Sequence, residues 1–187
     1  MGRLICTEIM SLDGYVNDEH GRFDWSAPDA EVHQFVNDLE RPIGTYLYGR
    51  RLYEVMKYWE TAHEQPDQTA VELDYARLWQ AAEKVVYSST LTTIESARTR
   101  IERTFDPDAL RAVKEESGGD LTIGGPTLAA HAFRAGLIDE VRLFLSPVIV
   151  GGGTRGLPDR VRADLSLAEE RRFAGGVVYL RYAVTRR

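Results

Sequence analysis

The chain has 187 residues, with 23 Lys or Arg against 29 Asp or Glu, so its formal net charge at pH 7 is −6. Hydrophobic residues make up 43% and charged residues 28%, values that fit a globular protein and exclude a disordered or fibrous one. No apolar run approaches the ~18 residues of a membrane helix, and the apolar stretch after Met1 is too short for a signal peptide. We therefore expect one cytoplasmic domain, residues 1–187, with no membrane partner.

The single cysteine, the spacing of the histidines and the distribution of charge exclude several further classes of protein. The single cysteine, Cys6, cannot form an intramolecular disulfide or a Cys-rich metal centre, and the four histidines form no HExxH or HxH motif, so no metal is expected. Residues 1–40 carry two basic and nine acidic side chains, whereas residues 121–187 carry ten and six. This distribution does not predict nucleic-acid binding, but the basic part could assist an anionic ligand or contact the acidic part of a second subunit.

The first half of the chain alternates between strand and helix patterns. A largely apolar stretch predicts a strand over residues 3–10, and the Asp-, Gly- and Asn-rich residues 11–28 predict a long loop, a candidate lid. Apolar residues at i, i+3, i+4 and i+7 predict a helix over 29–40 that Asp29 or Ser26 could cap. The same reasoning predicts a strand over 44–48, helices over 50–59 and 67–83, and a strand over 84–88.

The second half continues this alternation. A weaker strand is predicted over 99–104, a helix over 107–116 and a strand over 120–123. A Gly-Gly-Pro turn then opens a helix over 127–135, which Gly136 ends. A long apolar strand over 141–150 and two final stretches, 165–173 and 177–185, complete the chain. The pattern predicts an α/β fold: a mixed, mostly parallel central sheet flanked by helices, with an antiparallel C-terminal strand pair.

In such sheets ligands bind beyond the carboxyl ends of the strands, where glycine or a helix N-terminus follows. The segment 122–128, Thr-Ile-Gly-Gly-Pro-Thr-Leu, has this form, because two glycines allow close approach and the next helix directs free N–H groups outward. It predicts a phosphate-binding turn, and a simple tight turn is the alternative. The segment 151–156, Gly-Gly-Gly-Thr-Arg-Gly, matches GxGxxG but is followed by Pro158 and no helix, so it predicts a flexible loop rather than a Rossmann fingerprint.

Two further strand ends carry groups suited to anions. Gly49 leads into Arg50 and Arg51, whose guanidiniums could hold phosphates; a surface Arg pair at a helix start is the alternative. The strand over 84–88 ends in three hydroxyl residues, Ser88, Ser89 and Thr90, which could contact an anion or serve only turn and cap chemistry.

Several motifs together point to a known family: Ser-Leu-Asp-Gly at 11–14, Gly-Gly-Pro-Thr-Leu at 124–128, Gly-Leu-Ile-Asp-Glu at 136–140 and Ser-Pro-Val-Ile-Val-Gly at 146–151. Over nearly its whole length the chain resembles the dihydrofolate-reductase-like superfamily, within it the riboflavin-biosynthesis reductase type, the C-terminal domain of the bifunctional deaminase-reductase. Residues 48–54 look more like the dihydrofolate reductase segment for the adenosine end of NADPH. The chain therefore resembles a stand-alone, mosaic member.

This resemblance implies a reductase that transfers hydride from NADPH to a C=N or C=O carbon of a small heterocyclic substrate. It implies that the nicotinamide lies near residues 8–10 under the loop 11–17. We name Asp13 as an active-site residue, with an Asx-turn role as the alternative. The cofactor residues that it implies are Gly49, Arg50, Arg51, Ser88, Ser89, Thr90, Ile123, Gly124, Gly125, Pro126, Thr127 and Leu128.

The substrate is less defined. Riboflavin reductases usually carry Lys or Arg after the Ser-Leu-Asp-Gly motif, where this chain has Tyr15, so 5-amino-6-(5-phosphoribosylamino)uracil is one candidate substrate and a dihydrofolate or pterin is another. Glu31 or His33 could match the dihydrofolate reductase carboxylate, although either fits an exposed helix residue better. One cysteine cannot supply the HxE and PCxxC pattern of the zinc deaminase domain. A non-catalytic binding protein and a flavin- or quinone-linked oxidoreductase remain alternatives.

The apolar strand 141–150 also predicts a homodimer. Pro147 cannot donate a ladder hydrogen bond, which places this strand at or near a sheet edge that a second subunit could cover. Riboflavin-type reductase domains usually pair through this region. The alternative is a monomer in which the terminal strands shield the edge.

Overall fold

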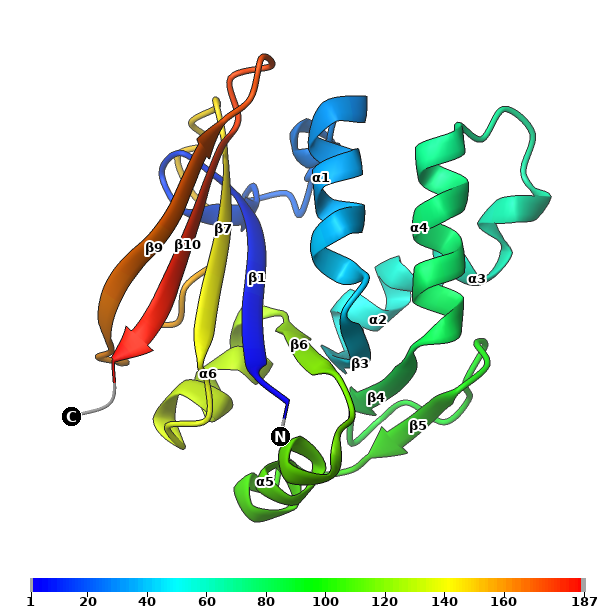
Figure 1. Cartoon of the computed structure of the whole chain (residues 1–187), viewed down its shortest axis with the longest axis vertical. Helices are drawn as coiled ribbons and strands as arrows, with labels where there is room; N and C mark the ends of the chain where they lie inside the picture. Colours follow the sequence, from blue (N-terminus) through cyan, green and yellow to red (C-terminus); the bar gives the residue numbers. More distant parts are fainter. Residues whose placement is uncertain (1, 186–187) are drawn as a thin grey trace.

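The computed structural model describes residues 2–185, and Figure 1 shows its strands and helices. The strands are β1 (Leu4–Ser11), β2 (Tyr15–Asn17), β3 (Ile43–Gly49), β4 (Glu83–Tyr87), β5 (Thr99–Glu102), β6 (Asp120–Gly124), β7 (Glu140–Ser146), β8 (Thr154–Arg155), β9 (Asp164–Arg172) and β10 (Val178–Thr185). The helices are α1 (Ala30–Glu40), α2 (Arg50–Met56), α3 (Tyr58–Thr61), α4 (Ala70–Ala81), α5 (Pro107–Glu116) and α6 (Pro126–Arg134), with 3-10 turns η1 (Asp24–Ser26) and η2 (Ala62–Glu64). Met1, Arg186 and Arg187, which the predicted domain includes, lie outside the described residues.

Within residues 2–185 an eight-stranded sheet has the order β5-β4-β3-β6-β1-β7-β10-β9. The pairs from β5 to β7 are all parallel, and β10 is antiparallel to both β7 and β9. The predicted mixed, mostly parallel sheet with an antiparallel C-terminal pair is therefore confirmed. A small antiparallel ribbon, β2 with β8, lies apart from this sheet.

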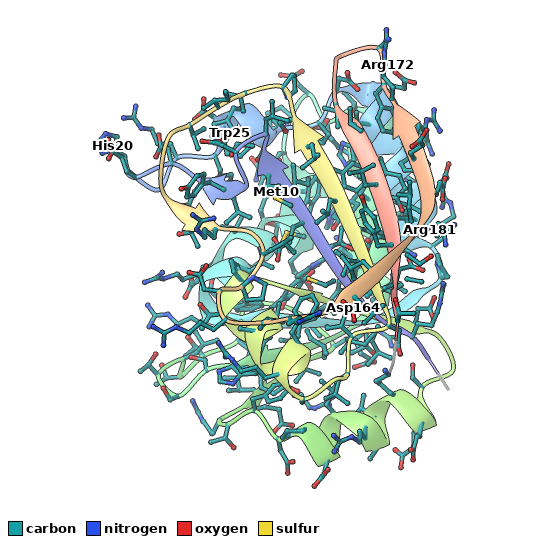
Figure 2. All side chains as sticks on the ribbon, turned by 90° about the vertical axis from the view of Figure 1, so that its left-hand side faces the viewer. Met10, His20, Trp25, Asp164, Arg172 and Arg181 are labelled. Atoms are coloured by element: carbon teal, nitrogen blue, oxygen red, sulfur yellow. The ribbon has the colours of Figure 1, made fainter. Side chains whose placement is uncertain are left out.

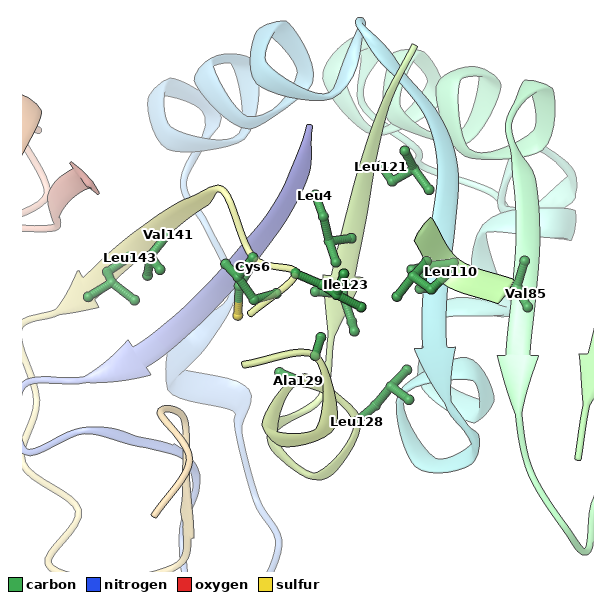
Figure 3. Packing of buried hydrophobic residues seen from close by; sticks show 14 of the residues in the cluster. Leu4, Cys6, Val85, Leu110, Leu121, Ile123, Leu128, Ala129, Val141 and Leu143 are labelled. Carbon is green, nitrogen blue, oxygen red and sulfur yellow. The ribbon is translucent and has the colours of Figure 1, made fainter. Parts of the chain in front are cut away.

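Helices cover both faces of the parallel part of the sheet. In Figure 1, α1 and α4 lie on one side and α5 and α6 on the other. Alternate residues of β1 point to opposite faces, so Cys6 packs with Ile123 and with Leu128 of α6, whereas Ile5 packs with Tyr46 on the α4 side. Figure 3 shows the first of these clusters, with strands β1 and β6 above α6.

Local chemistry sets most element boundaries. Asp29 caps α1, accepting a hydrogen bond from the Val32 amide. The predicted helix over 67–83 starts only at Ala70, because Thr69 forms a capping box with Glu72. The predicted helix over 50–59 is divided into α2 and α3, and the predicted loop 11–28 contains β2 and η1.

The predicted position of the strand over 141–150 is wrong. β7 ends at Ser146, before Pro147, and lies between β1 and β10 rather than at an edge. Proline does interrupt the ladder, but it does so by ending the strand instead of marking an edge. The strands at the two ends of the described sheet are β5 and β9.

Among residues 2–185 no helix has the length and apolar character that crossing a bilayer requires. The same residues contain no cluster of three or more His, Cys, Asp or Glu side chains arranged to hold a metal ion.

Candidate functional site

The three predicted anion-binding segments come together at one edge of the sheet. β4, β3 and β6 are neighbours in the sheet and run parallel, so their carboxyl ends lie side by side. Gly49 pairs with Tyr87, directly before Ser88, and Tyr48 pairs with Gly124. Residues far apart in the sequence thus form a single row along this edge.

The turn after β6 has the geometry of an anion cradle. Gly125 has a φ of 91°, a conformation that other residues rarely adopt, and a Cβ at Gly124 would lie 2.5 Å from Cδ2 of Leu52. Gly125 is the N-cap of α6 but provides no side-chain cap, and Pro126 follows at the first helical position. The N-cap residue therefore supplies no side-chain acceptor for the backbone N–H groups of the first turn of α6, and these groups can face a ligand.

The other residues of this segment divide by burial. Ile123 and Leu128 point into the core, 0% and 6% exposed, and only their backbone groups are suited to the cradle. Thr127 is exposed at the start of α6. The predicted segment is thus a backbone site in which Thr127 supplies the one free hydroxyl.

Beside the cradle, the start of α2 meets the loop that follows β4. The Arg50 guanidinium donates to Oγ1 of Thr90 at 2.9 Å, and both residues are exposed, as are Arg51 and Ser89. Ser88 is buried instead, and its Oγ accepts from the amides of Thr90 and Leu91. Ser88 therefore shapes the turn, while Arg50, Arg51, Ser89 and Thr90 present polar groups to solvent.

Arg103 is a residue of this region that the sequence did not indicate. Its Nη1 donates to the backbone carbonyls of Ser88 at 3.1 Å and Leu91 at 2.7 Å. These bonds hold the 88–91 turn against the chain that leaves β5. No sequence motif marks Arg103, because its role follows only from the pairing of β5 with β4.

The loop after β1 forms a second wall near this edge. The Asp13 carboxylate accepts from the amides of Val150 at 3.1 Å and Gly151 at 2.8 Å, so it ties the 11–14 turn to the chain after β7. A hydrogen bond with Ser11, followed by those two amides, holds the pKa of Asp13 below its ordinary value. The catalytic role of Asp13 stays a prediction, while its contacts describe a residue that positions this loop.

The glycine-rich segment 151–156 belongs to the same wall. It contains β8, which pairs with β2, and no helix follows it within the described residues, so the segment is not a Rossmann fingerprint. Figure 2 shows this ribbon and the loop with Trp25 beside the end of β1 at Met10.

Glu31 and His33 do not face the cradle. Glu31 accepts from the amide of Ala174 and from Arg171 at the β9–β10 turn. His33 is 8% exposed, with its ring 5.9 Å from that of Trp59 and 5.7 Å from that of Tyr75. Burial lowers the pKa of His33. The expectation of an exposed helix residue holds for Glu31 and is wrong for His33, which fills an aromatic cluster.

Glu8 adds a buried acid to the site. It is 7% exposed on β1, and its carboxyl lies beside the Gly125 backbone at the cradle. A glutamate in an otherwise apolar strand is the sequence signal that could have identified it.

Parallel strand ends, a glycine turn at a helix N-terminus and adjacent exposed arginines define an α/β protein with groups suited to anions gathered at one edge of its sheet. The chain matches the RibD C-terminal domain family over residues 3–179 and belongs to this family. It is similar to the protein YyaP of Bacillus subtilis (strain 168), at 29% identity over 184 residues, or 96% of this chain and 94% of that protein.

Solved structures show the same fold. A Shewanella sp. PV-4 chain whose name relates it to riboflavin biosynthesis has a TM-score of 0.75 at 18% identity, covering 98% of this chain and 99% of that one. A Thermotoga maritima diaminohydroxyphosphoribosylaminopyrimidine deaminase/5-amino-6-(5-phosphoribosylamino)uracil reductase has a TM-score of 0.68 at 14% identity. The match covers 98% of this chain but only 57% of that longer one.

Proposed function

We propose that the protein is an NADPH-dependent reductase that transfers hydride to a C=N or C=O carbon of a small heterocycle. Membership in the RibD C-terminal domain family supports a reductase role. The observation that carries the proposal is the row formed by the Gly124–Gly125 turn and the Arg50–Thr90 pair on adjacent strand ends. This row offers backbone N–H groups beside guanidiniums, which are the groups that bind the phosphates of a dinucleotide.

In this proposal different residues bind different parts of the cofactor. The free backbone N–H groups in the first turn of α6 hold the diphosphate, with Gly125 and Pro126 setting the turn. Gly49, Arg50, Arg51 and the 88–90 turn hold the adenosine phosphates, and Arg50 with Thr90 faces the 2′-phosphate. The residues fit the cofactor because the cradle excludes side chains and the neighbouring cations are exposed.

NADPH, when bound, supplies the hydride, and the chain has to bind, orient and shield it. The 11–28 loop and the 147–156 segment, joined by Asp13, form the cover that excludes water from the end of β1. A positioning role of Asp13 is consistent with proton delivery through solvent, which requires no dedicated acid.

For the substrate we propose a phosphorylated pyrimidine, with 5-amino-6-(5-phosphoribosylamino)uracil as the candidate. Tyr15 stands where riboflavin reductases usually have a cation, but the Arg155 guanidinium lies 5.6 Å from the centre of the Tyr15 ring. Arg155 is exposed on β8 and pairs with Tyr15 of β2, so a positive charge lies beside Tyr15. This contact favours a phosphate-bearing pyrimidine over an uncharged pterin.

We further propose a homodimer, now through β9 and β10 rather than through β7. Leu167 pairs with Tyr182 and Leu165 with Val184, so these four side chains share one face, and the two leucines are 50% and 41% exposed. In Figure 2 no helix lies between these strands and the viewer. An apolar face beside an edge strand favours association with a second copy.

We expect NADPH to bind more tightly than NADH in titration calorimetry, because Arg50 adds a charge-assisted bond to the 2′-phosphate. The Arg50→Ala variant should weaken NADPH binding by about 10- to 100-fold and leave NADH binding unchanged. Arg172→Ala, which removes an exposed arginine on the β9–β10 hairpin, is the control. Equal affinities of the wild-type protein for both cofactors would remove Arg50 and Thr90 from the site.

Thr127→Asp should abolish NADPH binding without unfolding the protein. A carboxylate in the first turn of α6 favours the helix but repels a diphosphate at the same amides. The control is Ala70→Asp, which places the same charge on an exposed residue in the first turn of α4. Thermal unfolding by circular dichroism reports folding, and unchanged NADPH affinity in Thr127→Asp would exclude the cradle assignment.

The substrate class is tested by following NADPH absorbance with pyrimidine and pterin candidates. Arg155→Ala should raise the KM of a phosphoribosyl pyrimidine by roughly tenfold, the loss of one charge-assisted bond, and leave the KM of an unphosphorylated analogue unchanged. Turnover of a pterin alone would contradict the phosphate preference. NADPH binding without turnover of any candidate would favour a binding protein, and a yellow co-purified chromophore would favour a flavin-linked oxidoreductase.

Light scattering at micromolar concentration should give about twice the 21.1 kDa chain mass, as expected for a symmetric pair. Leu167→Glu should reduce the mass to that of one chain, whereas Ile94→Glu, at another exposed apolar residue, should not. A single-chain mass for the wild-type protein would show that β9 and β10 do not form a dimer interface.

A further inference from the structure

Glu8 is a buried acid in the centre of the sheet. It lies on β1 between Cys6 and Met10, and these alternate residues share the face that α6 covers. Cys6 and Met10 are 0% and 3% exposed and belong to the apolar cluster, whereas Glu8, at 7%, places a carboxyl among them. A carboxyl at such a position is costly to bury and contributes nothing to apolar packing.

The Glu8 carboxyl has a buried oxygen that forms no hydrogen bond. This oxygen is Oε1, and the Gly125 backbone is the polar group beside the carboxyl. Burial raises the pKa of Glu8 to about 8, and the Gly125 backbone only partly opposes this shift. Around neutral pH the side chain is therefore mostly the uncharged acid.

The surroundings of Glu8 supply no compensating charge. Cys6 is the titratable neighbour on the same strand, and its buried thiol has a raised pKa, to which Glu8 contributes. The neighbouring strand β7 places Leu143 opposite Glu8, and α6 begins with Pro126, Thr127 and Leu128, none of which is charged. In the described part of the chain, no charged side chain contributes to the raised pKa of Glu8.

The Gly125 backbone beside Glu8 belongs to the cradle itself. Gly125 caps α6, a nine-residue helix whose N-terminal end carries a partial positive charge. The N-terminal end of α6 therefore attracts both a diphosphate on its solvent side and the Glu8 carboxylate on its buried side. Two anions at one helix end repel each other, and because Glu8 is buried the repulsion is poorly screened, so a bound diphosphate favours the neutral form of Glu8.

We propose that Glu8 is the proton-binding residue of the anion cradle: it must carry a proton while a diphosphate occupies the Gly124–Leu128 turn. When the diphosphate binds a protein whose Glu8 is ionised, the carboxylate takes one proton from solution and becomes the neutral acid. This inference rests on the proposed function, because it assumes that the cradle binds NADPH.

The test measures NADPH affinity by calorimetry between pH 6.5 and 9.5. We expect a constant affinity near neutral pH and a loss of about tenfold per pH unit above the pKa of Glu8, with proton uptake detected in buffers of different ionisation enthalpy. Glu8→Gln keeps an oxygen beside the Gly125 backbone but cannot ionise, so its affinity should be independent of pH and its proton uptake absent. A merely structural Glu8 would not produce this difference.

Glu40→Gln is the matched control. Glu40 is a second buried carboxyl, 6% exposed, whose pKa burial raises to about 7, but it lies at the end of α1 beside Tyr46 and Arg142. This variant should retain the alkaline loss of affinity. If Glu40→Gln abolished that loss and Glu8→Gln did not, the proposal would be wrong.

Thermal unfolding gives a readout that needs no ligand. Because the pKa of Glu8 is about 8 in the folded protein and 4.5 without burial, folding binds a proton between these values, and this contribution to stability falls as pH rises from 4.5 to 8. Glu8→Gln should therefore gain in Tm relative to wild type toward pH 8, with the difference shrinking toward pH 5. A Tm difference that does not change with pH would contradict the assignment of Glu8 as a buried acid with a raised pKa.

The outcomes separate the two levels of the proposal. NADPH binding with the same pH profile in wild type and Glu8→Gln would overturn the role of Glu8 and leave the proposed cofactor site standing. Absence of NADPH binding at every pH in both proteins would overturn the proposed function, and the inference with it.

Discussion

The parallel pairing of β4, β3, β6 and β1 is the constraint on which the site depends. Backbone hydrogen bonds fix these strands in register, and parallel direction brings all their carboxyl ends to one edge. Each strand then continues into a segment of different chemistry: hydroxyls after β4, arginines after β3, the glycine turn after β6 and the Asp13 loop after β1. The sheet thus brings polar segments that are far apart in the sequence side by side along one edge.

The α6 N-terminus has two roles in this arrangement. Through Leu128 and Ala129 it closes the core over β1 and β6, as Figure 3 shows, and through its first amides it faces the polar row. Glycine is needed at both positions, because a Cβ at Gly124 would clash with Leu52 and Gly125 has a positive φ. Glu8 lies where these two roles meet, which explains how an acid inside the core can affect binding at the surface.

Local patterns predicted much of the fold and part of the site. The Gly124–Gly125 turn into α6 and the cap at Asp29 follow from short-range chemistry, and the structure confirms these elements and the mixed sheet. The sequence could not place β7 inside the sheet, because strand order depends on long-range pairing that Pro147 does not report. Arg103 and His33 were missed or misplaced for the same reason: their partners are distant in the sequence.

The sheet order also shapes how the chain folds. Within residues 2–185 β1 pairs only with β6 and β7, so Leu4 pairs with Leu121 and Ile5 with Glu140, residues that lie far along the chain. Such distant pairing raises the contact order and slows folding, since a long loop must close before any of these hydrogen bonds forms. During synthesis this largely apolar strand stays unpaired until β6 has emerged, and its side chains are open to non-native association in that interval.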